Sequence, residues 1–271
     1  ENALRAAAAV DTFASHASGD MQNLIATLDF ADVATIRQAF VQMTPDVYNS
    51  LVQSVFSAAR QNSNMMAQHL IAKGGERFVR RANPAEGEWN TFLSAFGGSF
   101  RQKGADAIHY DGERAGFFGG IEKEDVFGMT AGFHALASFQ KLDADTDIAS
   151  KAKTASLELG AHMRFAPNIW QGFNVYGSAG LGADYSKVRR PVSFGGYERK
   201  NKSEFALLRG SVLFGAGYDI YRPSFTVTPT AFLDFTAVRM PEIKEKDGDG
   251  ARLRLDDDIY SSLRGSVGLN L

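Results

Sequence analysis

The sequence predicts a mainly β protein, namely a transmembrane antiparallel up-and-down β-barrel that is preceded by an α-helical segment. Three observations lead to this fold class. Apolar residues recur at every second position from Trp89 onward, which is the period of a β-strand. The alternating runs are about 13 to 20 residues long, whereas strands of globular sheets usually have about 5 or 6. Long charged connections alternate with short turns such as EKED, APNI and YRPS, an asymmetry typical of outer-membrane barrels.

Residues 1–82 are predicted to form a helical linker or junction region. Apolar residues recur there at spacings of three and four, as in SLVQSVFSAAR. Thr44 followed by Pro45 is a helix start signal, and the next Gly-Gly pair is a stop signal, so one long helix is expected over 45–73. At 1.5 Å per residue this helix is about 43 Å long, which exceeds the bilayer core of about 30 Å. Shorter helices are expected near residues 2–17 and 32–42.

Residues 83–271 are predicted to form the barrel. Two weak strands near residues 89–100 and 113–122 and six clear ones bring the predicted number to eight. The clear strands are VFGMTAGFHALASF, TASLELGAHMRF, FNVYGSAGLGADY, FALLRGSVLFGAGYDI, FTVTPTAFLDFTAV and IYSSLRGSVGLNL. The stretch RRPVSFGGYERKNKS, residues 189–203, is expected to be one of the long charged loops.

Alternation alone does not say which face is outside, since a soluble lipocalin-type barrel has the same period with its apolar face inward. Charged and small residues on the polar face, the long strands and the aromatic residues that bracket the apolar face favour a membrane barrel. Phe127 and Phe139 are twelve residues apart, and so are Phe173 and Tyr185. Twelve residues span about 40 Å of strand, or about 28 Å of height at a tilt near 45°, close to the apolar band of about 25 Å in such barrels.

The apolar face is therefore expected to contact lipid, and the polar face to line the lumen. The lipid-facing residues are expected to be Phe127, Phe139, Phe173, Tyr185, Leu208, Val212 and Phe214. The lumen-facing residues are expected to be His134, Glu158, His162, Arg164, Asp184, Arg209, Asp219, Asp234 and Arg264. His134 and His162 lie on neighbouring strands, but no carboxylate is evident beside them, so we interpret them as hydrogen-bonded lumen fillers. Basic residues near the end of the long helix, among them His69, either pair with luminal carboxylates or simply flank the membrane.

Several motifs occur in a characteristic order along nearly the whole chain. NALRAAAAVDTF and LIATLDFADVATIRQAFVQMTPDVYNSLVQSVFSAAR belong to the helical part, and EWNTFLSAFGG, FFGGIEKE and TVTPTAFLDF belong to strands. This order resembles the C-terminal translocator β-barrel domain of autotransporters, the type V secretion family, with its preceding helical linker. The resemblance implies an outer-membrane translocator of a Gram-negative bacterium, which secretes or displays its own N-terminal passenger and leaves a helix in the pore. It further implies a monomer whose partners are outer-membrane lipids, the barrel-assembly machinery and the passenger.

One departure from the family concerns the number of strands, because the family has twelve and this sequence shows eight. A lumen of eight strands is filled by side chains, whereas a helix with its side chains needs about 10–12 Å. We therefore expect a C-terminally incomplete part of a twelve-strand barrel, with the helix over 45–73 as a luminal plug.

Other functions are less well supported by the residues. A net charge of −2 gives no reason to expect a nucleic-acid partner, and the absence of cysteine excludes disulfides and thiolate metal sites. The acidic stretches at 143–154 and 246–250 lack the full ligand set of a calcium loop. No catalytic residue, cofactor site or metal ligand is assigned, and no enzyme is expected, since no nucleophile, base and orienting group come together. The open alternatives are a passive outer-membrane pore or structural barrel with a helical extramembrane domain, and a barrel enzyme.

Overall fold

The computed structural model describes residues 2–14, 16–72, 89–103, 109–124, 129–144, 150–166, 172–221 and 226–270. The helices are α1 (Asn2–Ala14), α2 (Asp20–Asp29), α3 (Val33–Gln42) and α4 (Asp46–Ile71), with a short 3₁₀ turn at Asp249–Ala251. The long strands are β1 (Trp89–Gln102), β2 (Tyr110–Glu124), β3 (Met129–Ala144), β4 (Ser150–Phe165), β5 (Phe173–Phe194), β6 (Tyr197–Tyr218), β8 (Thr226–Met240) and β11 (Asp258–Asn270). The short strands are β7 (Ile220–Tyr221), β9 (Ile243–Lys244) and β10 (Arg254–Leu255).

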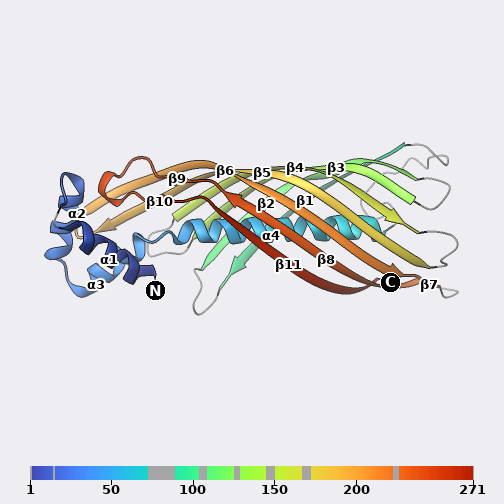
Figure 1. Ribbon diagram of the computed structural model, residues 1–271, viewed down its shortest axis with the longest axis horizontal. Coiled ribbons are helices and arrows are strands. Elements are labelled where there is room, and N and C mark those ends of the chain that lie inside the picture. Colours follow the sequence, from blue (N-terminus) through green and yellow to red (C-terminus); the bar gives the residue numbers. More distant parts are fainter. Residues whose placement is uncertain are drawn as a thin grey trace.

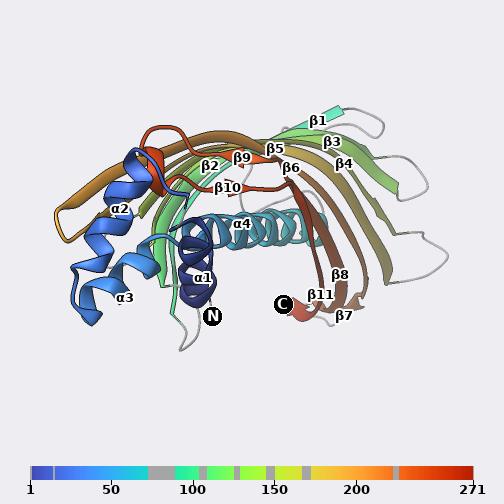
Figure 2. The same ribbon diagram turned by 60° about the vertical axis from the view of Figure 1, so that its left-hand side comes forward.

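The eight long strands form one antiparallel sheet in the order β1-β2-β3-β4-β5-β6-β8-β11 (Figure 1). Each long strand pairs with the next long strand along the chain, so the predicted up-and-down antiparallel fold is confirmed. The sheet curves into a trough around α4 (Figure 2). It does not close in the part of the chain that the structure describes, where β1 and β11 are its two edges.

Burial alternates along the strands because the concave face packs on α4, whereas the convex face is exposed. On β4, Leu157 and Leu159 are exposed and Glu158 between them is buried. The same alternation is found on β3 and β6. The period of two in the sequence therefore separates the two faces of this curved sheet.

One predicted loop is wrong. Residues 189–203 continue β5 and β6 into a long hairpin, in which Phe194 pairs with Tyr197. Gly195 and Gly196 make its two-residue turn at φ values of 51° and 86°, a backbone that favours glycine. The charged residues that suggested a loop are mostly exposed, for example Glu198, Lys200 and Lys202. Charge on one face of a strand that extends into water therefore gave the same signal as a loop.

The first three helices pack at the tip of this hairpin (Figure 1). Leu24 and Leu28 of α2 share an apolar cluster with Val192 and Phe194 of β5. Helix α2 was not expected from the sequence, whereas the helices near 2–17 and 32–42 are confirmed as α1 and α3. No helix in the described part of the chain is long and apolar enough to cross a membrane.

Candidate functional site

Helix α4 lies along the concave face of the sheet and is the element around which the candidate site is built (Figures 1 and 2). Its first turn lies near the β5–β6 hairpin, where the Tyr48 hydroxyl donates to Glu245 at 2.8 Å and lies 2.9 Å from Ser203 Oγ. Its last turn lies near the start of β1 and the end of β2, where His69 contacts Glu122 and Phe92. The helix begins one residue later than expected, since Pro45 is its N-cap, and the expected glycine stop lies outside the described residues.

Apolar side chains hold α4 at both ends. Near its start, Leu51 and Val55 pack in one cluster with Leu207 of β6. Near its end, Met66 and Leu70 pack in a second cluster, whose members on the sheet are Phe92, Phe118, Leu136, Tyr176, Leu213 and Phe232. The sequence had suggested a uniformly polar inward face. In the structure this face is apolar near both ends of α4, because a helix rather than water covers it.

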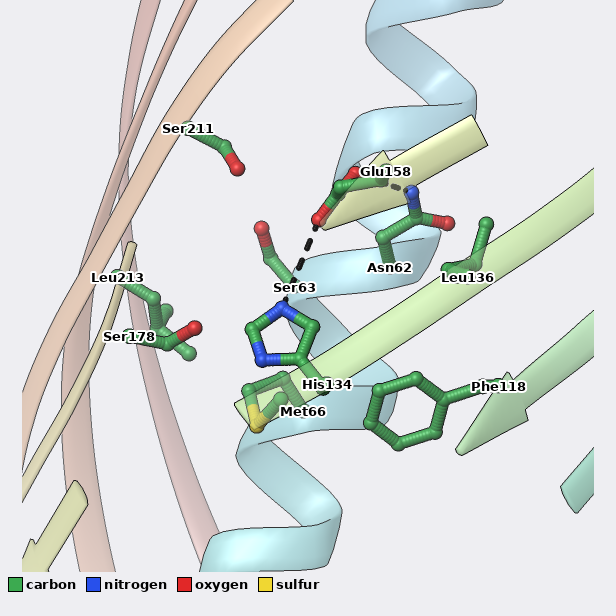
Figure 3. A pocket seen from close by; sticks show the side chains of 10 residues that line it. All are labelled: Asn62, Ser63, Met66, Phe118, His134, Leu136, Glu158, Ser178, Ser211 and Leu213. Carbon is green, nitrogen blue, oxygen red and sulfur yellow. Dashed lines mark hydrogen bonds and ion pairs between the residues drawn. The ribbon is translucent and has the colours of Figure 1, made fainter. Parts of the chain in front are cut away.

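Between the two apolar clusters the contacts of α4 are polar. The Asn62 side chain donates to Glu158 at 2.9 Å and accepts from Arg114 at 2.8 Å. Ser63 donates to Asp234 at 3.1 Å. Figure 3 shows Asn62, Ser63 and Glu158 around a cavity of about 10 Å³, which is near the smallest space that holds one water. The middle of the helix is thus bound to the wall of the trough, with little space between the two at this point.

Four buried charges surround this contact. Arg209 pairs with Glu158 and, at 3.2 Å, with Asp184, while Arg114 is bound to Asn62 and to Ser138. Two cations and two carboxylates balance one another, which a buried group of charges requires. A Cβ at Gly182 would lie 3.0 Å from the Arg209 guanidinium. The small residue on β5 therefore makes room for the arginine of β6.

Three histidines and two carboxylates meet near the last turn of α4. His162 Nδ1 lies 3.4 Å from His134 Nδ1, as the neighbouring strands had suggested. The expectation that no carboxylate lies beside this pair is wrong, since Glu122 is 3.3 Å from His162. In addition, Glu158 is 3.9 Å from His134 (Figure 3). His69 pairs with Glu122 at 2.8 Å rather than with any of the carboxylates considered from the sequence.

The remaining residues expected in the lumen also lie on the concave side, but not all of them contact one another. Asp234 accepts from Arg264 at 3.3 Å. Arg164 donates to Asn174 at 2.6 Å, and Asp219 accepts from Thr228 at 2.7 Å. All are buried except Arg264, which is half-buried on the edge strand β11.

The residues expected to face lipid lie on the convex side wherever the structure describes them. Phe139, Tyr185, Leu208, Val212 and Phe214 are exposed, Phe173 is half-buried, and Phe127 lies outside the described residues. Phe139 and Tyr185 fall on one row across the sheet, since both lie opposite Ala155 of β4. Aromatic side chains therefore lie at one level on β3 and β5, the two neighbours of β4.

Sequence reasoning missed several residues that hold the site together. Arg114 and Glu122 share the inward face of β2, and their even spacing was a signal in a strand whose pattern is otherwise weak. Arg190 pairs with Glu245 at 2.6 Å and donates to the Gln42 carbonyl at 2.6 Å, which ties α3 to β5. Arg190 could not be placed while residues 189–203 were assigned to a loop.

The acidic stretches that resemble calcium loops have other contacts. Asp143 pairs with Lys151 at 3.5 Å, although residues 145–149 lie outside the described part of the chain. Asp247 accepts from Lys202 at 3.0 Å. These carboxylates therefore lie in ordinary exposed ion pairs.

The geometry of an inward-facing helix against a curved antiparallel sheet can be compared with known proteins. The family model for the autotransporter β-domain matches residues 91–271. The chain belongs to the autotransporter β-domain family. A comparison with curated protein sequences gives no match.

Two solved autotransporter structures are similar to this autotransporter domain. The translocator domain of autotransporter NalP from Neisseria meningitidis matches with a TM-score of 0.61 and 16% identity, over 79% of this chain and 70% of that chain. The β domain of the Bordetella autotransporter BrkA matches with a TM-score of 0.46 and 15% identity, over 69% of each chain. At such identities, the NalP similarity supports the fold alone.

Membership of the family settles the general class of the protein. Autotransporter β-domains are β-barrels in the outer membrane of Gram-negative bacteria, and they are secretion pores rather than enzymes. A linked passenger domain is part of this arrangement. The chain is therefore an outer-membrane autotransporter domain.

Proposed function

We propose that this domain translocates its own N-terminal passenger, and that α4 is the part of the chain that runs through the barrel to the passenger. The observation that carries the proposal is the set of hydrogen bonds along α4. Within the described residues, its side chains bond to residues of seven of the eight long strands. Contact with nearly the whole wall supports a plug in a pore over an extramembrane domain.

The direction of α4 agrees with this function. Its C-terminal end lies beside Glu122 and Phe92, at the end of the sheet where β1 begins. Its N-terminal end lies beside the β5–β6 hairpin, where α1–α3 are packed (Figure 1). Outer-membrane barrels have their longer loops on the outside of the cell. A passenger joined before α1 would therefore emerge at the cell surface.

The two faces of the sheet take the roles that a membrane pore requires. We assign Leu208, Val212 and Phe214 to contact with lipid, and Tyr185 and Phe139 to the aromatic row at the outer edge of the apolar band. The inward residues centred on Arg209 bind α4 in the lumen. We further propose residues 1–82 as the helical linker region and 83–271 as the barrel region of a monomer that the barrel-assembly machinery inserts.

Surface display of a reporter tests the proposed translocation. A reporter domain fused ahead of residue 2 of the complete protein should be detected by antibody on intact cells. Replacing the barrel region by an unrelated outer-membrane barrel should abolish this signal while the fusion still accumulates. A passive pore would leave the reporter inside the cell in both fusions, which would contradict the proposal.

Conductance in planar bilayers tests the position of α4 separately. Deleting residues 46–71 from the complete protein should raise single-channel conductance, because the helix no longer obstructs the lumen. Deleting α1 is the control, since the main contacts of α1 in the described part of the chain are with α2 and α3. Unchanged conductance after the α4 deletion, with a folded barrel, would show that the helix does not fill the pore.

A further inference from the structure

We propose that His69, Glu122 and His162 form a binding site for a divalent cation of the zinc class. The three residues come from α4, β2 and β4, which are distant in the sequence. A bound ion would fasten the last turn of α4 to two strands of the wall. This inference concerns binding at the end of the helix and is independent of whether the domain translocates a passenger.

The donor atoms already converge. Glu122 Oε2 lies 2.8 Å from His69 Nε2 and 3.3 Å from His162 Nε2. The donor atoms of the three residues all lie within 4.8 Å of one another. All three side chains are at least nine-tenths buried, with exposed fractions of 7% for His69, 3% for Glu122 and 0% for His162. A cation placed between them would be shielded from bulk water.

The ligand types and spacings fit zinc. Two imidazoles and one carboxylate form a known three-ligand zinc set, with metal–ligand distances of about 2.0–2.2 Å. Tetrahedral geometry at those distances separates ligand atoms by about 3.3 Å. The Glu122–His162 distance already has this value, and His69 needs to withdraw from Glu122 by about 0.5 Å. The donor atoms of His69 and His162 lie within 4.8 Å of each other, so binding also requires a small rotation of the rings toward the ion. Imidazole ligands favour zinc over calcium or magnesium, which prefer oxygen.

The positions of the protons on His162 and His134 also favour a bound ion. Without a metal, His162 Nε2 needs a proton to bond Glu122, and His134 Nε2 needs one to face Glu158. If both rings are neutral and carry their proton on Nε2, their two Nδ1 atoms are unprotonated and face each other at 3.4 Å. Two acceptors then meet with no hydrogen between them.

A metal on His162 Nε2 removes this conflict. His162 Nδ1–H then donates to His134 Nδ1, and His134 Nε2–H faces Glu158. This is the carboxylate–histidine support that metal-binding imidazoles commonly have. His134 and Glu158 are therefore positioning residues, and the pair interpreted from the sequence as lumen fillers becomes one ligand and its support.

Aromatic rings hold the ligand from α4 in place. Phe92 stacks on His69 with a centroid distance of 4.0 Å, and Phe118 lies edge-on to the same ring at 6.1 Å. An apolar shell of this kind limits water access and fixes the orientation of the imidazole. His69 can therefore keep its Nε2 atom directed at Glu122 even though it is attached to a different element.

Isothermal titration of the refolded full chain in detergent, with Zn²⁺ alone as the probe, tests the site. One ion per chain should bind. His69→Ala, Glu122→Gln and His162→Ala should each weaken binding by at least about a hundredfold, and His134→Ala by about 10–100-fold as a supporting residue. The double variant His16→Ala/His109→Ala, which removes the two histidines outside the cluster, should bind zinc with unchanged affinity.

A spectroscopic measurement on the unsubstituted protein covers the case in which a variant fails to fold. The visible spectrum of the Co²⁺-loaded chain should be that of a tetrahedral site with nitrogen and oxygen ligands. Zinc binding no tighter than in the variant lacking all three ligands would overturn the proposal. It would also be overturned by an octahedral cobalt spectrum, or by loss of binding in the double control variant.

Discussion

Val212→Arg should destabilise the folded protein in a bilayer, because the proposed lipid contact puts Val212 at the middle of the apolar band. Tyr185 on β5 lies opposite Ala206 on β6, which marks one aromatic row. Phe173 lies opposite Tyr218, which marks the other. Val212 is six residues from each row, or about 20 Å along the strand and about 14 Å in height at a tilt near 45°.

The magnitude follows from this depth. An arginine on the lipid face near the bilayer midplane costs about 2–4 kcal/mol, and the cost falls toward zero near the interfaces. Glu198→Arg is the matched control, because Glu198 lies on the same strand and the same face but eight residues beyond the row at Ala206. That distance places Glu198 in water, so the control should lose almost nothing.

The assay is reversible unfolding by denaturant in lipid vesicles. The free energy of unfolding of each variant is compared with that of the parent protein, and the comparison requires that the slopes of the transitions be equal. A loss of about 2–4 kcal/mol for Val212→Arg against almost none for Glu198→Arg is expected. Equal losses for the two variants would refute the assignment of the convex face to lipid. A larger loss for Glu198→Arg would move the apolar band toward the hairpin and refute the aromatic rows as its limits.

The remaining predictions concern buried and exposed charges. Arg209→Ala leaves Glu158 and Asp184 buried without their cation, so the same unfolding assay should show a loss of about 3–5 kcal/mol; a loss below about 1 kcal/mol would contradict the buried network. Burial tends to raise the pKa of Asp20, but hydrogen bonds led by Arg199 outweigh it and lower that pKa from 3.8 to about 2. The docking of α2 should therefore be intact above about pH 4 and weaken as pH falls toward 2. Pepsin should cut next to α2 at pH 2 and not at pH 4, whereas an Asp20→Asn variant should be cut equally at both.

The strands and their faces could be predicted from the sequence because a period of two is local information. Eight long strands, and the placement of Arg209 on the face opposite Leu208, follow from that period alone. That this face is the inward one needed the strand lengths and the bracketing aromatic residues as well. The hairpin at 189–203 could not be recognised, because its charged outer face hides the alternation of Val192 and Phe194 on the inner one. The Gly195-Gly196 pair was the available signal for a hairpin, because Gly-Gly is a preferred two-residue turn. This signal carries more weight than the charged residues around it.

The candidate site was harder to predict because it depends on which helix residue meets which strand. His69 and Glu122 are 53 positions apart, and nothing in either local pattern indicates that they pair. Periodicity also suggests that Ser211 faces an open polar lumen, with room for a large side chain. In the structure Ser211 lines a cavity of only about 10 Å³ against α4. The filling of the lumen is a tertiary property that a strand pattern does not contain.

The inward residues of β6 nevertheless match the helix zone by zone. Leu207 packs in the apolar cluster at the start of α4, Arg209 lies in the polar middle, and Leu213 packs in the cluster at its end. An empty aqueous lumen would expose both leucines, at a cost of about 1.5–3 kcal/mol each for a side chain that is now fully buried. It would also remove Asn62 from between Glu158 and Arg114. The wall therefore has the composition of a surface that folds around a helix, which favours α4 as a lasting part of the folded domain over a segment that only passes through it.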